Sequence, residues 1–460
     1  MPAHDAIHSD LPSERVAAHR TTSPRALPRL GTLARFANRI RTFIDPLTAS
    51  QRVLRAHGDL VAVDDRVICT DAPAIAKEVL LDHRTFTKDF SQVYDVLSTS
   101  FWGSGFAVSN QDAWLRKRRV VQAALSADHL RAYADVVTAG ASRLLDTWRS
   151  GETRDVQADL MRLTLENTAR VCAGSDLDAA LPQIEAAVVA AMRWFENVEL
   201  HAIGAETREE VGFKEAVARM NEQLAGVIQR RRSAPEPRKD VLSAMMSTPC
   251  EDGSLMTDDE LRDELVTMFR AGHRNTATTL AWAIGLLAAH PRAQEELAGE
   301  LARVLGGRAP ALTDVPRLSY ATRVVQETMR CYPLYPFILR EARQGGTLAG
   351  RRIPASSKVI ISIWSMHRDG RTFDRPDAFE PDRWAAPLDD AREIYAFLPF
   401  GGGPRRCPFK SYAMVEAVLL LASLAQRFRF RLAPGHRLRP MNTANGLMPR
   451  DGMKIVLEAR

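Results

Sequence analysis

The feature that most restricts the fold is a cysteine at the end of a glycine-rich loop, directly before an apolar helix. Residues 397–409 read FLPFGGGPRRCPF, so three glycines and a proline precede Cys407. Glycines let a backbone approach a flat group closely, and the start of a helix favours a thiolate through its dipole and its N–H donors. Arg405 adds a cation that can meet a carboxylate. A lone cysteine at such a place is more often an inert buried thiol, so the loop alone leaves both interpretations open.

Hydrophobic periodicity predicts a mainly α-helical protein with a small β region. Long amphipathic runs extend from Ala113 to Leu301, and helices are also expected at Ala72–Leu81 and Lys410–Phe428. Residues 369–406 hold many Pro, Asp and Gly without periodicity, which predicts a long irregular loop of the kind that compact domains keep for function. Short alternating segments predict strands at residues 60–63, 66–69, 347–349, 352–354 and 358–364.

Length and composition fit one large globular domain. The chain has 460 residues, 45% of them hydrophobic and 26% charged, so it can bury a large core. No interior stretch rich in Pro, Gly, Ser or charge separates two cores. Residues 1–28 lack apolar periodicity and are expected to form a flexible leader. We therefore expect a leader at 1–28 and a single domain at 29–460.

The composition argues against several other kinds of protein. The five cysteines lie far apart with no CxxC pair, which argues against a zinc or dithiol site and favours a reducing cytoplasm. The N-terminus lacks a signal-like apolar stretch, and the most apolar run, 412–425, is shorter than the ~20 residues that cross a bilayer. The net charge is +6, but the basic residues are mixed with 56 acidic ones. We expect a cytoplasmic protein with no membrane span and no nucleic-acid partner.

The residues around Cys407 carry a family resemblance. At every fixed position up to the cysteine they match FxxGxRxC, the haem-binding signature of the cytochrome P-450 family; the matched residues are Phe400, Gly403, Arg405 and Cys407. The chain thus resembles the soluble, bacterial-type haem-thiolate monooxygenases. The resemblance implies the cytochrome P-450 fold, with haem b between a long central helix and the cysteine loop and with Cys407 as the axial iron ligand. The final glycine of the usual signature is Phe409 here, which bears on how closely the last helix approaches the ring.

Three further residues resemble the network that locks the cysteine loop in this family. Glu327 and Arg330 lie three residues apart, so they share a helix face and can form a charge-assisted pair. Such pairs are common on solvated helix faces, but together with Arg383 in FEPDRW they resemble the Glu-Arg-Arg network of the family. His367 in WSMHRDG also matches a family position, where a packing and hydrogen-bonding role is expected. The implied role of this network is structural.

Four residues are expected to bind the carboxylates of haem. Trp114 and Arg118 are one helical turn apart in WLRKRR, so an indole N–H and a guanidinium point the same way. An ordinary basic helix would show the same spacing. The resemblance makes these two residues donors to a haem propionate, with Arg405 and Arg340 as further partners.

Basic residues on two segments are expected to place positive charge on one side of the haem. They are Arg116, Lys117, Arg119, Arg406 and Lys410. A solvated basic face would look the same. In this family the cysteine side receives electrons from a ferredoxin or flavodoxin-type donor that has its own reductase, so steering of such a partner is expected. The chain shows no flavin or nicotinamide fingerprint of its own.

The long helix expected from Asp258 to His290 departs from the family pattern. Its run FRAGHRNTATTL places Ala271-Gly272 where the family has its oxygen-binding groove. The family continues with an acid and a Thr that relay protons, but these two positions hold Arg274 and Asn275 here. A guanidinium cannot release and regain a proton near neutral pH, so Arg274 can bind or orient but cannot shuttle. The candidate catalytic residues are Gly272, Arg274, Asn275 and Thr276.

Three functions remain compatible with these residues. The first is a reductase-dependent monooxygenase of a small organic, secondary-metabolite substrate, with protons from the substrate's polar groups or from waters on Asn275. The second is a peroxide-using peroxygenase in which Arg274 binds a substrate carboxylate, and the third is a haem protein that does not oxygenate. We favour the first function because the cysteine loop is of the ordinary type. For Arg274 itself a purely structural role is a further alternative, in which its side chain turns away and pairs with another helix. Substrate contacts are expected from Arg274, Phe337 and Ile338, within the segments 93–108, 194–206 and 336–339.

Overall fold

The computed structural model describes residues 27–460 with several gaps. The gaps are residues 33, 36, 39–40, 42–44, 89–102, 110, 197–207, 235–237, 387–393 and 444–445. The expected leader lies outside the described residues except for its last two positions. Most of the expected substrate segments 93–108 and 194–206 lies outside them as well.

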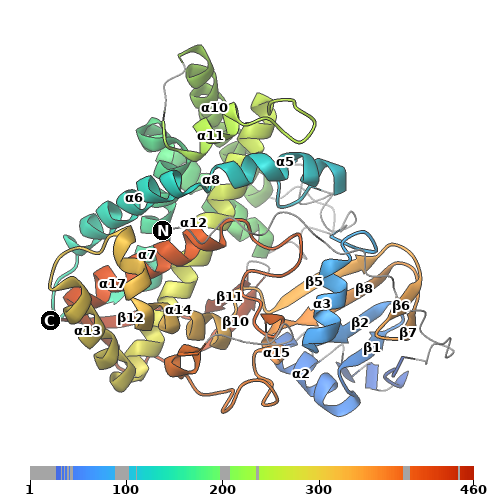
Figure 1. Cartoon of the computed structure of the whole chain (residues 1–460). Coiled ribbons are helices and arrows are strands. Elements are labelled where there is room, and N and C mark those ends of the chain that lie inside the picture. The colour runs from blue at the N-terminus through green and yellow to red at the C-terminus, as the bar shows by residue number, and fades with distance from the viewer. Residues whose placement is uncertain are drawn as a thin grey trace.

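Helices dominate the described chain, as the sequence predicts, and Figure 1 shows most of them gathered beside a smaller β region. Their bounds lie within a few residues of the expected ones where the periodicity is strong. The helices are α2 (Pro46–His57), α3 (Pro73–Leu81), α5 (Gln111–Ala123), α6 (Ala127–Leu145), α7 (Val156–Ala173), α8 (Leu181–Glu196), α10 (Arg208–Ser233), α11 (Val241–Ser247), α12 (Asp258–Ala289), α13 (Pro291–Leu305), α14 (Ser319–Cys331), α15 (Ile363–Met366) and α17 (Lys410–Arg427).

The 32-residue helix α12 is the long helix that the sequence predicts. It starts with a capping box, because the Thr257 hydroxyl accepts a hydrogen bond from the Glu260 N–H while the Glu260 carboxylate accepts one from the Thr257 N–H. Acids in its first turn favour the positive end of the helix dipole. α12 packs along α7, where a Cβ on Gly272 would lie 3.1 Å from the Thr168 hydroxyl. Gly272 therefore lets the two helices approach closely.

A five-stranded sheet joins the two ends of the chain. Its order is β1-β2-β8-β5-β3, from strands β1 (Leu60–Asp64), β2 (Val67–Thr70), β3 (Phe86–Thr87), β5 (Phe337–Ala342) and β8 (Ser357–Ser362). β1 and β2 form the expected antiparallel hairpin. β2 pairs with β8 in parallel, with Cys69 opposite Ile360, although about three hundred residues separate them in the sequence.

Among the described residues, three smaller sheets contain the remaining strands, and the sequence predicted only two of these strands. β6 (Gly346–Leu348) and β7 (Arg351–Ile353) form the expected short pair, whereas β4 (Thr153–Asp155), β9 (Phe428–Leu432) and β12 (Lys454–Ala459) form a sheet that was not expected. β10 (Pro440–Thr443) and β11 (Gly446–Pro449) form a hairpin. The strand expected over 358–364 ends at Ser362, because the Ser362 hydroxyl accepts a hydrogen bond from the Ser365 N–H and caps α15.

The cysteine loop lies where two hydrophobic cores meet. The larger core joins helices from α5 to α17 with the β9-β12 sheet, and Phe397, Phe400 and Phe409 pack against it. The second core lies between α3 and the five-stranded sheet, and Leu398 belongs to it. The loop is therefore supported from both sides.

Candidate active site

Backbone hydrogen bonds and one close glycine contact give the Cys407 loop its shape. The N–H of Cys407 donates to the carbonyl of Phe400 at 2.9 Å. Gly403 has a φ of 67°, and a Cβ there would lie 2.0 Å from the carbonyl oxygen of Leu80 at the end of α3. Only glycine fits this position, both for its backbone conformation and for the approach of α3.

Burial opposes the charged form of the Cys407 sulfur. Burial raises the pKa of the Cys407 thiol, while a hydrogen bond from the backbone N–H of Phe409 acts in the other direction. The backbone donor before α17 thus acts in the direction that the sequence predicts, although burial outweighs it. Phe409 has a φ of −86°, which any residue adopts, so the missing glycine of the usual signature causes no backbone strain.

The expected Glu-Arg-Arg residues lie together. The fully buried side chains of Glu327 and Arg330 form two hydrogen bonds of 2.9 Å, and Arg383 donates to Glu327 at 3.0 Å. Burial raises the pKa of Glu327, but the hydrogen bonds and charges of Arg330 and Arg383 reverse this shift and lower it overall. Trp384 adds an indole N–H at 2.9 Å. The carboxylate of Glu327 thus fastens residues 380–384 to α14.

His367 continues this support toward the cysteine loop. Its ring is fully buried, and its Nε2 accepts a hydrogen bond of 3.1 Å from the N–H of Leu398. Burial lowers the pKa of His367 to about 3, so the ring is neutral and can accept. Arg330 donates to the carbonyl of His367 at 2.8 Å. The network therefore runs from α14 to the start of the cysteine loop.

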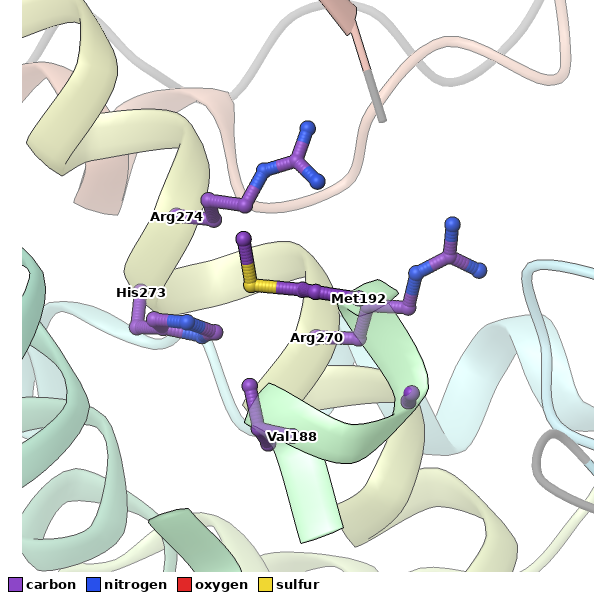
Figure 2. Close-up of a pocket in the computed structure, with 6 residues that line it drawn as sticks. Val188, Met192, Arg270, His273 and Arg274 are labelled. Carbon is purple, nitrogen blue, oxygen red and sulfur yellow. The ribbon is translucent and has the colours of Figure 1, made fainter. Parts of the chain in front are cut away.

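Arg274 lies on the side of α12 that faces α8. It is 3% exposed and lines a small cavity of about 10 Å³ with Val188 and Met192 of α8. Figure 2 shows Arg270 and Arg274 of α12 beside Met192 of α8, and all three side chains line this cavity. Arg270, one turn before Arg274, is a second cation at this place that sequence reasoning missed.

The other groove residues differ in their surroundings. Thr276 is buried and its hydroxyl donates to the carbonyl of Gly272 at 3.5 Å, while Asn275 is half-buried. His273 is buried, and burial lowers its pKa to about 4, so its ring is neutral. Asn275, Thr276 and His273 thus offer an amide, a hydroxyl and a neutral imidazole, and none of the three side chains is an acid.

Glu416 is a buried carboxyl that sequence reasoning used only as an interruption of an apolar run. It lies on α17 with no exposed surface. Burial raises the pKa of Glu416 to about 7, while the side chains of Thr276, Tyr412 and Asn167 act to lower it. Thr276 belongs to α12 and Asn167 to α7, so this carboxyl lies where three helices meet.

The pH dependence of stability should report on Glu416. A raised pKa in the folded state means that ionisation costs stability as the pH rises from the unfolded-state value toward 7. Glu416→Gln removes that cost, so we expect the variant to gain about 2–3 kcal/mol over the parent between pH 5 and pH 8. Urea unfolding at both pH values measures the gain. The control is Glu222→Gln, because Glu222 is an exposed acid on α10, and this variant should gain no stability over the parent. If the unfolding free energies of Glu416→Gln and the parent changed equally with pH, the prediction would be contradicted.

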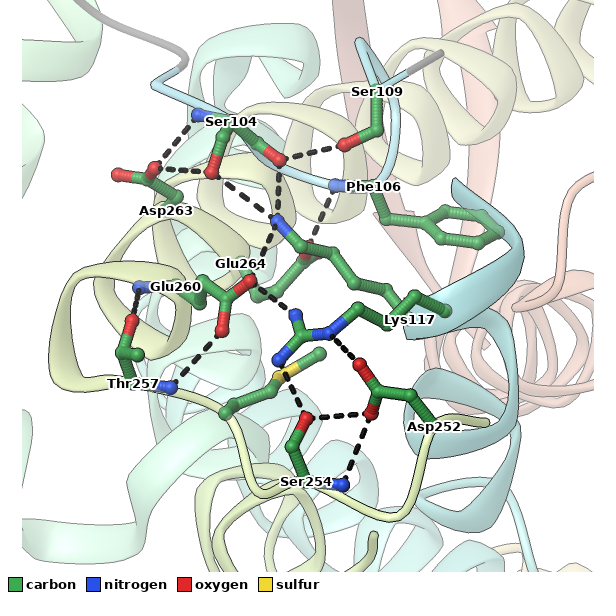
Figure 3. A network of polar contacts seen from close by, with 12 residues as sticks. Ser104, Phe106, Ser109, Lys117, Asp252, Ser254, Thr257, Glu260, Asp263 and Glu264 are labelled. Carbon is green, nitrogen blue, oxygen red and sulfur yellow. Dashed lines mark hydrogen bonds and ion pairs between the residues drawn. The ribbon is translucent and has the colours of Figure 1, made fainter. Parts of the chain in front are cut away.

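The expected basic face is smaller than the sequence suggested. Arg116 donates to Asp252 at 2.8 Å and to Glu260 at 2.5 Å, so its charge is paired with acids beside α12. Lys117 is 2% exposed and donates to the carbonyl of Ser104 at 2.6 Å (Figure 3). The expectation is wrong for these two residues, because adjacent positions on a helix point in different directions. Arg119, Arg406 and Lys410 are exposed.

Trp114 lies between two guanidinium groups at the edge of the cysteine loop. The guanidinium carbons of Arg118 and Arg405 lie 5.2 and 4.6 Å from the centre of its ring. Arg118 donates to the carbonyl of Pro404 at 3.1 Å, and Arg405 donates to the carbonyl of Ser109 at 2.8 Å. Burial lowers the pKa of Arg405 to about 10. The expected propionate partners Trp114, Arg118 and Arg405 therefore lie together.

Lys88 adds a cation to this group that sequence reasoning missed. Its ammonium donates to the carbonyl of Ala107 at 2.6 Å. Burial, together with the charges of Arg340, Arg405 and Arg270, lowers the pKa of Lys88 to about 7. No local pattern marks Lys88 in the sequence, because the cations around it come from three other segments. The geometry brings all the expected carboxylate partners and Lys88 into one neighbourhood.

Such a concentration of like charge suits a group that carries carboxylates. Neighbouring cations make one another's charged state less favourable, and anions placed between them make it favourable again. Haem has two carboxylates and an iron that binds a thiolate, so the cations and the Cys407 sulfur fit this cofactor. The described residues contain no cluster of three His, Cys, Asp or Glu that could hold a metal ion directly. We call the group of Lys88, Trp114, Arg118, Arg340 and Arg405 the cationic cradle. A cysteine ligand beside such a cradle defines a haem-thiolate protein.

The chain belongs to the cytochrome P450 family, whose model matches residues 59–457. Over 91% of its length it is 32% identical to cyclooctatin synthase of Streptomyces melanosporofaciens, covering 92% of that protein. It is 30% identical to cyclooctat-9-en-7-ol 5-monooxygenase of the same organism, over 91% of each chain. It is 28% identical to pentalenene oxygenase of Streptomyces avermitilis, over 95% of this chain and 97% of the relative.

Family membership confirms the mainly helical cytochrome P450 fold with small sheets and makes the chain an oxidoreductase that incorporates oxygen. It also implies a haem cofactor, a small-molecule substrate and a separate source of electrons. Within the described residues no helix is long and apolar enough to cross a membrane.

Proposed function

We propose that the chain is a cytoplasmic monooxygenase that inserts one oxygen atom of O2 into a small, largely apolar secondary metabolite. The observation that carries this proposal is the ordinary cysteine loop around Cys407 joined to the cationic cradle. Relatives named for oxygenation of pentalenene and of cyclooctat-9-en-7-ol support an alkene or alkenol as the substrate class. Electrons would come from a ferredoxin or flavodoxin-type donor and its reductase.

The residues divide into two groups around haem b. Cys407 would bind the haem iron, and Trp114, Arg118, Arg340 and Arg405 would bind the haem carboxylates. Bound haem supplies the activation of O2. The Glu327 network keeps the cysteine loop in place, and residues 29–460 would form one domain.

Proton delivery must use a route that does not begin at Arg274. The guanidinium keeps its proton near neutral pH, whereas the Asn275 amide can hold a water and the Thr276 hydroxyl can donate. Polar groups of the substrate are a second source. The role of Arg274 in this proposal is to bind or orient the substrate. Phe337 and Ile338 are half-buried on β5 and would supply apolar contacts.

Fewer basic residues than expected are exposed near the cysteine loop, but those that are exposed favour a negatively charged electron donor. Arg119, Arg406 and Lys410 are exposed, and Arg406 and Lys410 flank Cys407 in the sequence. Three positive charges close to the cysteine loop would steer an acidic protein to this side.

A peroxygenase acting on a carboxylate is the second candidate, because Arg270 and Arg274 place two cations at the same cavity. A substrate carboxylate between them would form charge-assisted hydrogen bonds. Under this function Arg274→Ala weakens the binding of dodecanoate much more than that of dodecanol. Equal effects on the two ligands exclude the anchor role.

The choice of oxidant tests the proposal directly. Pentalenene and cyclooctat-9-en-7-ol are incubated with reduced ferredoxin and its reductase, or with hydrogen peroxide alone, and the products are measured by mass spectrometry. We expect oxygenated product with the ferredoxin system and little with peroxide. Product with peroxide alone would establish the peroxygenase instead. Reductant consumption that does not respond to either compound would indicate a haem protein that does not oxygenate.

A further inference from the structure

Residues 103–109, which we call the strap, lie directly on α12. A Cβ on Gly105 would lie 2.1 Å from the hydroxyl of Thr267, and a Cβ on Gly103 would lie 2.2 Å from the carboxylate of Asp263. Both glycines therefore let the strap backbone touch the side chains of α12 without a gap.

Two neighbouring acids of α12 accept hydrogen bonds from the strap backbone. Asp263 accepts from the N–H of Ser104 at 2.7 Å, and Glu264 accepts from the N–H of Phe106 at 2.7 Å (Figure 3). Hydrogen bonds to charged groups are among the stronger ones in proteins. The start of the strap is thus held by α12 through its main chain.

Lys117 of α5 completes this attachment from the other side. Its ammonium donates to the carbonyl of Ser104 at 2.6 Å and lies 3.7 Å from the carboxylate of Glu264. Lys117 is 2% and Glu264 1% exposed, so each charge is removed from water and depends on the other and on the strap. Burial raises the pKa of Glu264 to about 7, while the charge of Lys117 acts to lower it.

The far end of the strap contacts the cations of the cradle. Lys88 donates to the carbonyl of Ala107 at 2.6 Å, and Arg405 donates to the carbonyl of Ser109 at 2.8 Å. Between the two ends, the Phe106 ring lies 6.0 Å from the Trp114 ring, centre to centre. The strap therefore links α12 to the cationic cradle.

We propose that Glu264 and Lys117 are positioning residues for the substrate: they hold the strap on α12 and thereby set one wall of the space in which the substrate would bind. The proposal rests on the proposed function only in placing a substrate in that space. Glu264→Ala removes the acceptor of the Phe106 N–H and leaves Lys117 without its carboxylate, so the strap should move while Cys407 keeps its surroundings.

Amide hydrogen exchange of residues 103–109 in the ferric holoenzyme measures the attachment itself. We expect Glu264→Ala to speed exchange at Phe106 by about tenfold or more, because a hydrogen bond to a charged group is lost. Glu264→Gln keeps an oxygen acceptor and should retain part of the protection, which also covers the case that the alanine variant does not fold. Asp252→Asn is the matched control, since Asp252 belongs to the same network at its exposed end and should not alter exchange.

Two azole probes then report on the pocket wall without requiring turnover or the natural substrate. Imidazole occupies only the iron site, whereas 4-phenylimidazole also extends into the pocket, and the Soret shift gives a Kd for each. We expect Glu264→Ala and Lys117→Met to weaken 4-phenylimidazole by about tenfold and to leave imidazole unchanged. Unchanged amide exchange of the strap in Glu264→Ala overturns the proposal. Faster exchange also overturns it if the Kd values of the two azoles change equally or do not change. A failure of the proposed function would appear only in the oxidant assay.

Discussion

Replacing Cys407 with Ala or His is expected to abolish the red-shifted Soret band that the ferrous carbonyl complex shows when a thiolate binds the iron. The alanine variant has no sulfur, and histidine offers a neutral nitrogen that donates less electron density. Because Cys407 is the proposed ligand, we expect complete loss of the band and of product formation, the largest effect of any single change.

Cys69→Ala is the matched control for this experiment. Cys69 is also buried, and burial raises the pKa of its thiol to about 12, but it lies on β2 in the five-stranded sheet. The band should persist in this variant at unchanged intensity for each haem bound. A Cys407→Ala protein with the parent spectrum would show that another group binds the iron.

Arg330→Met should be the most damaging substitution for the fold outside the cysteine loop. It leaves the Glu327 carboxylate buried with Arg383 as its remaining cation, and it removes the donor to the carbonyl of His367. Removing one partner of a buried pair typically costs about 3–5 kcal/mol. We expect a loss of that size in urea unfolding, together with poor retention of haem, because the carbonyls of Pro376 and Ala378 also lose their donor on α14.

Arg323→Met provides the comparison on the same helix. Arg323 pairs with the exposed carboxylate of Asp382 at 3.5 Å, and such surface pairs contribute about 0–1 kcal/mol. A loss in Arg330→Met no larger than in Arg323→Met would mean that the Glu327 network does not secure the loop. Glu327→Gln should fall between the two, since an amide still accepts from Arg330 but carries no charge.

Buried charge thus serves two purposes in this chain. Glu327 and Arg330 carry opposite charges that pair with each other, and this pair supports the cysteine loop. In the cradle, the cations near Lys88 instead depress its pKa, which suits an anionic cofactor. A buried Arg or Lys that pairs with an acid stabilises the fold. Several buried Arg and Lys side chains that lie together form a binding site for an anion.

The sequence by itself determined the features that depend on short spacing. Cys407 lies a few residues after its glycines, Glu327 and Arg330 lie three residues apart, and the hydrophobic residues of the helices recur with helical spacing. These patterns were sufficient to predict the family, the cofactor and a mainly helical fold. The departure at Arg274 and Asn275 was equally visible, because it concerns neighbouring positions in one helix.

Only the tertiary structure decided which distant groups meet. Lys88 joins the cradle, Glu416 lies beside Thr276, and Lys117 pairs with Glu264 instead of facing solvent. The parallel pairing of β2 with β8 likewise joins segments from opposite ends of the chain. Periodicity shows that a side chain is buried but not what it is buried against. Partners far apart in the sequence are set by how helices and sheets pack, and the charge of a buried group depends on those partners.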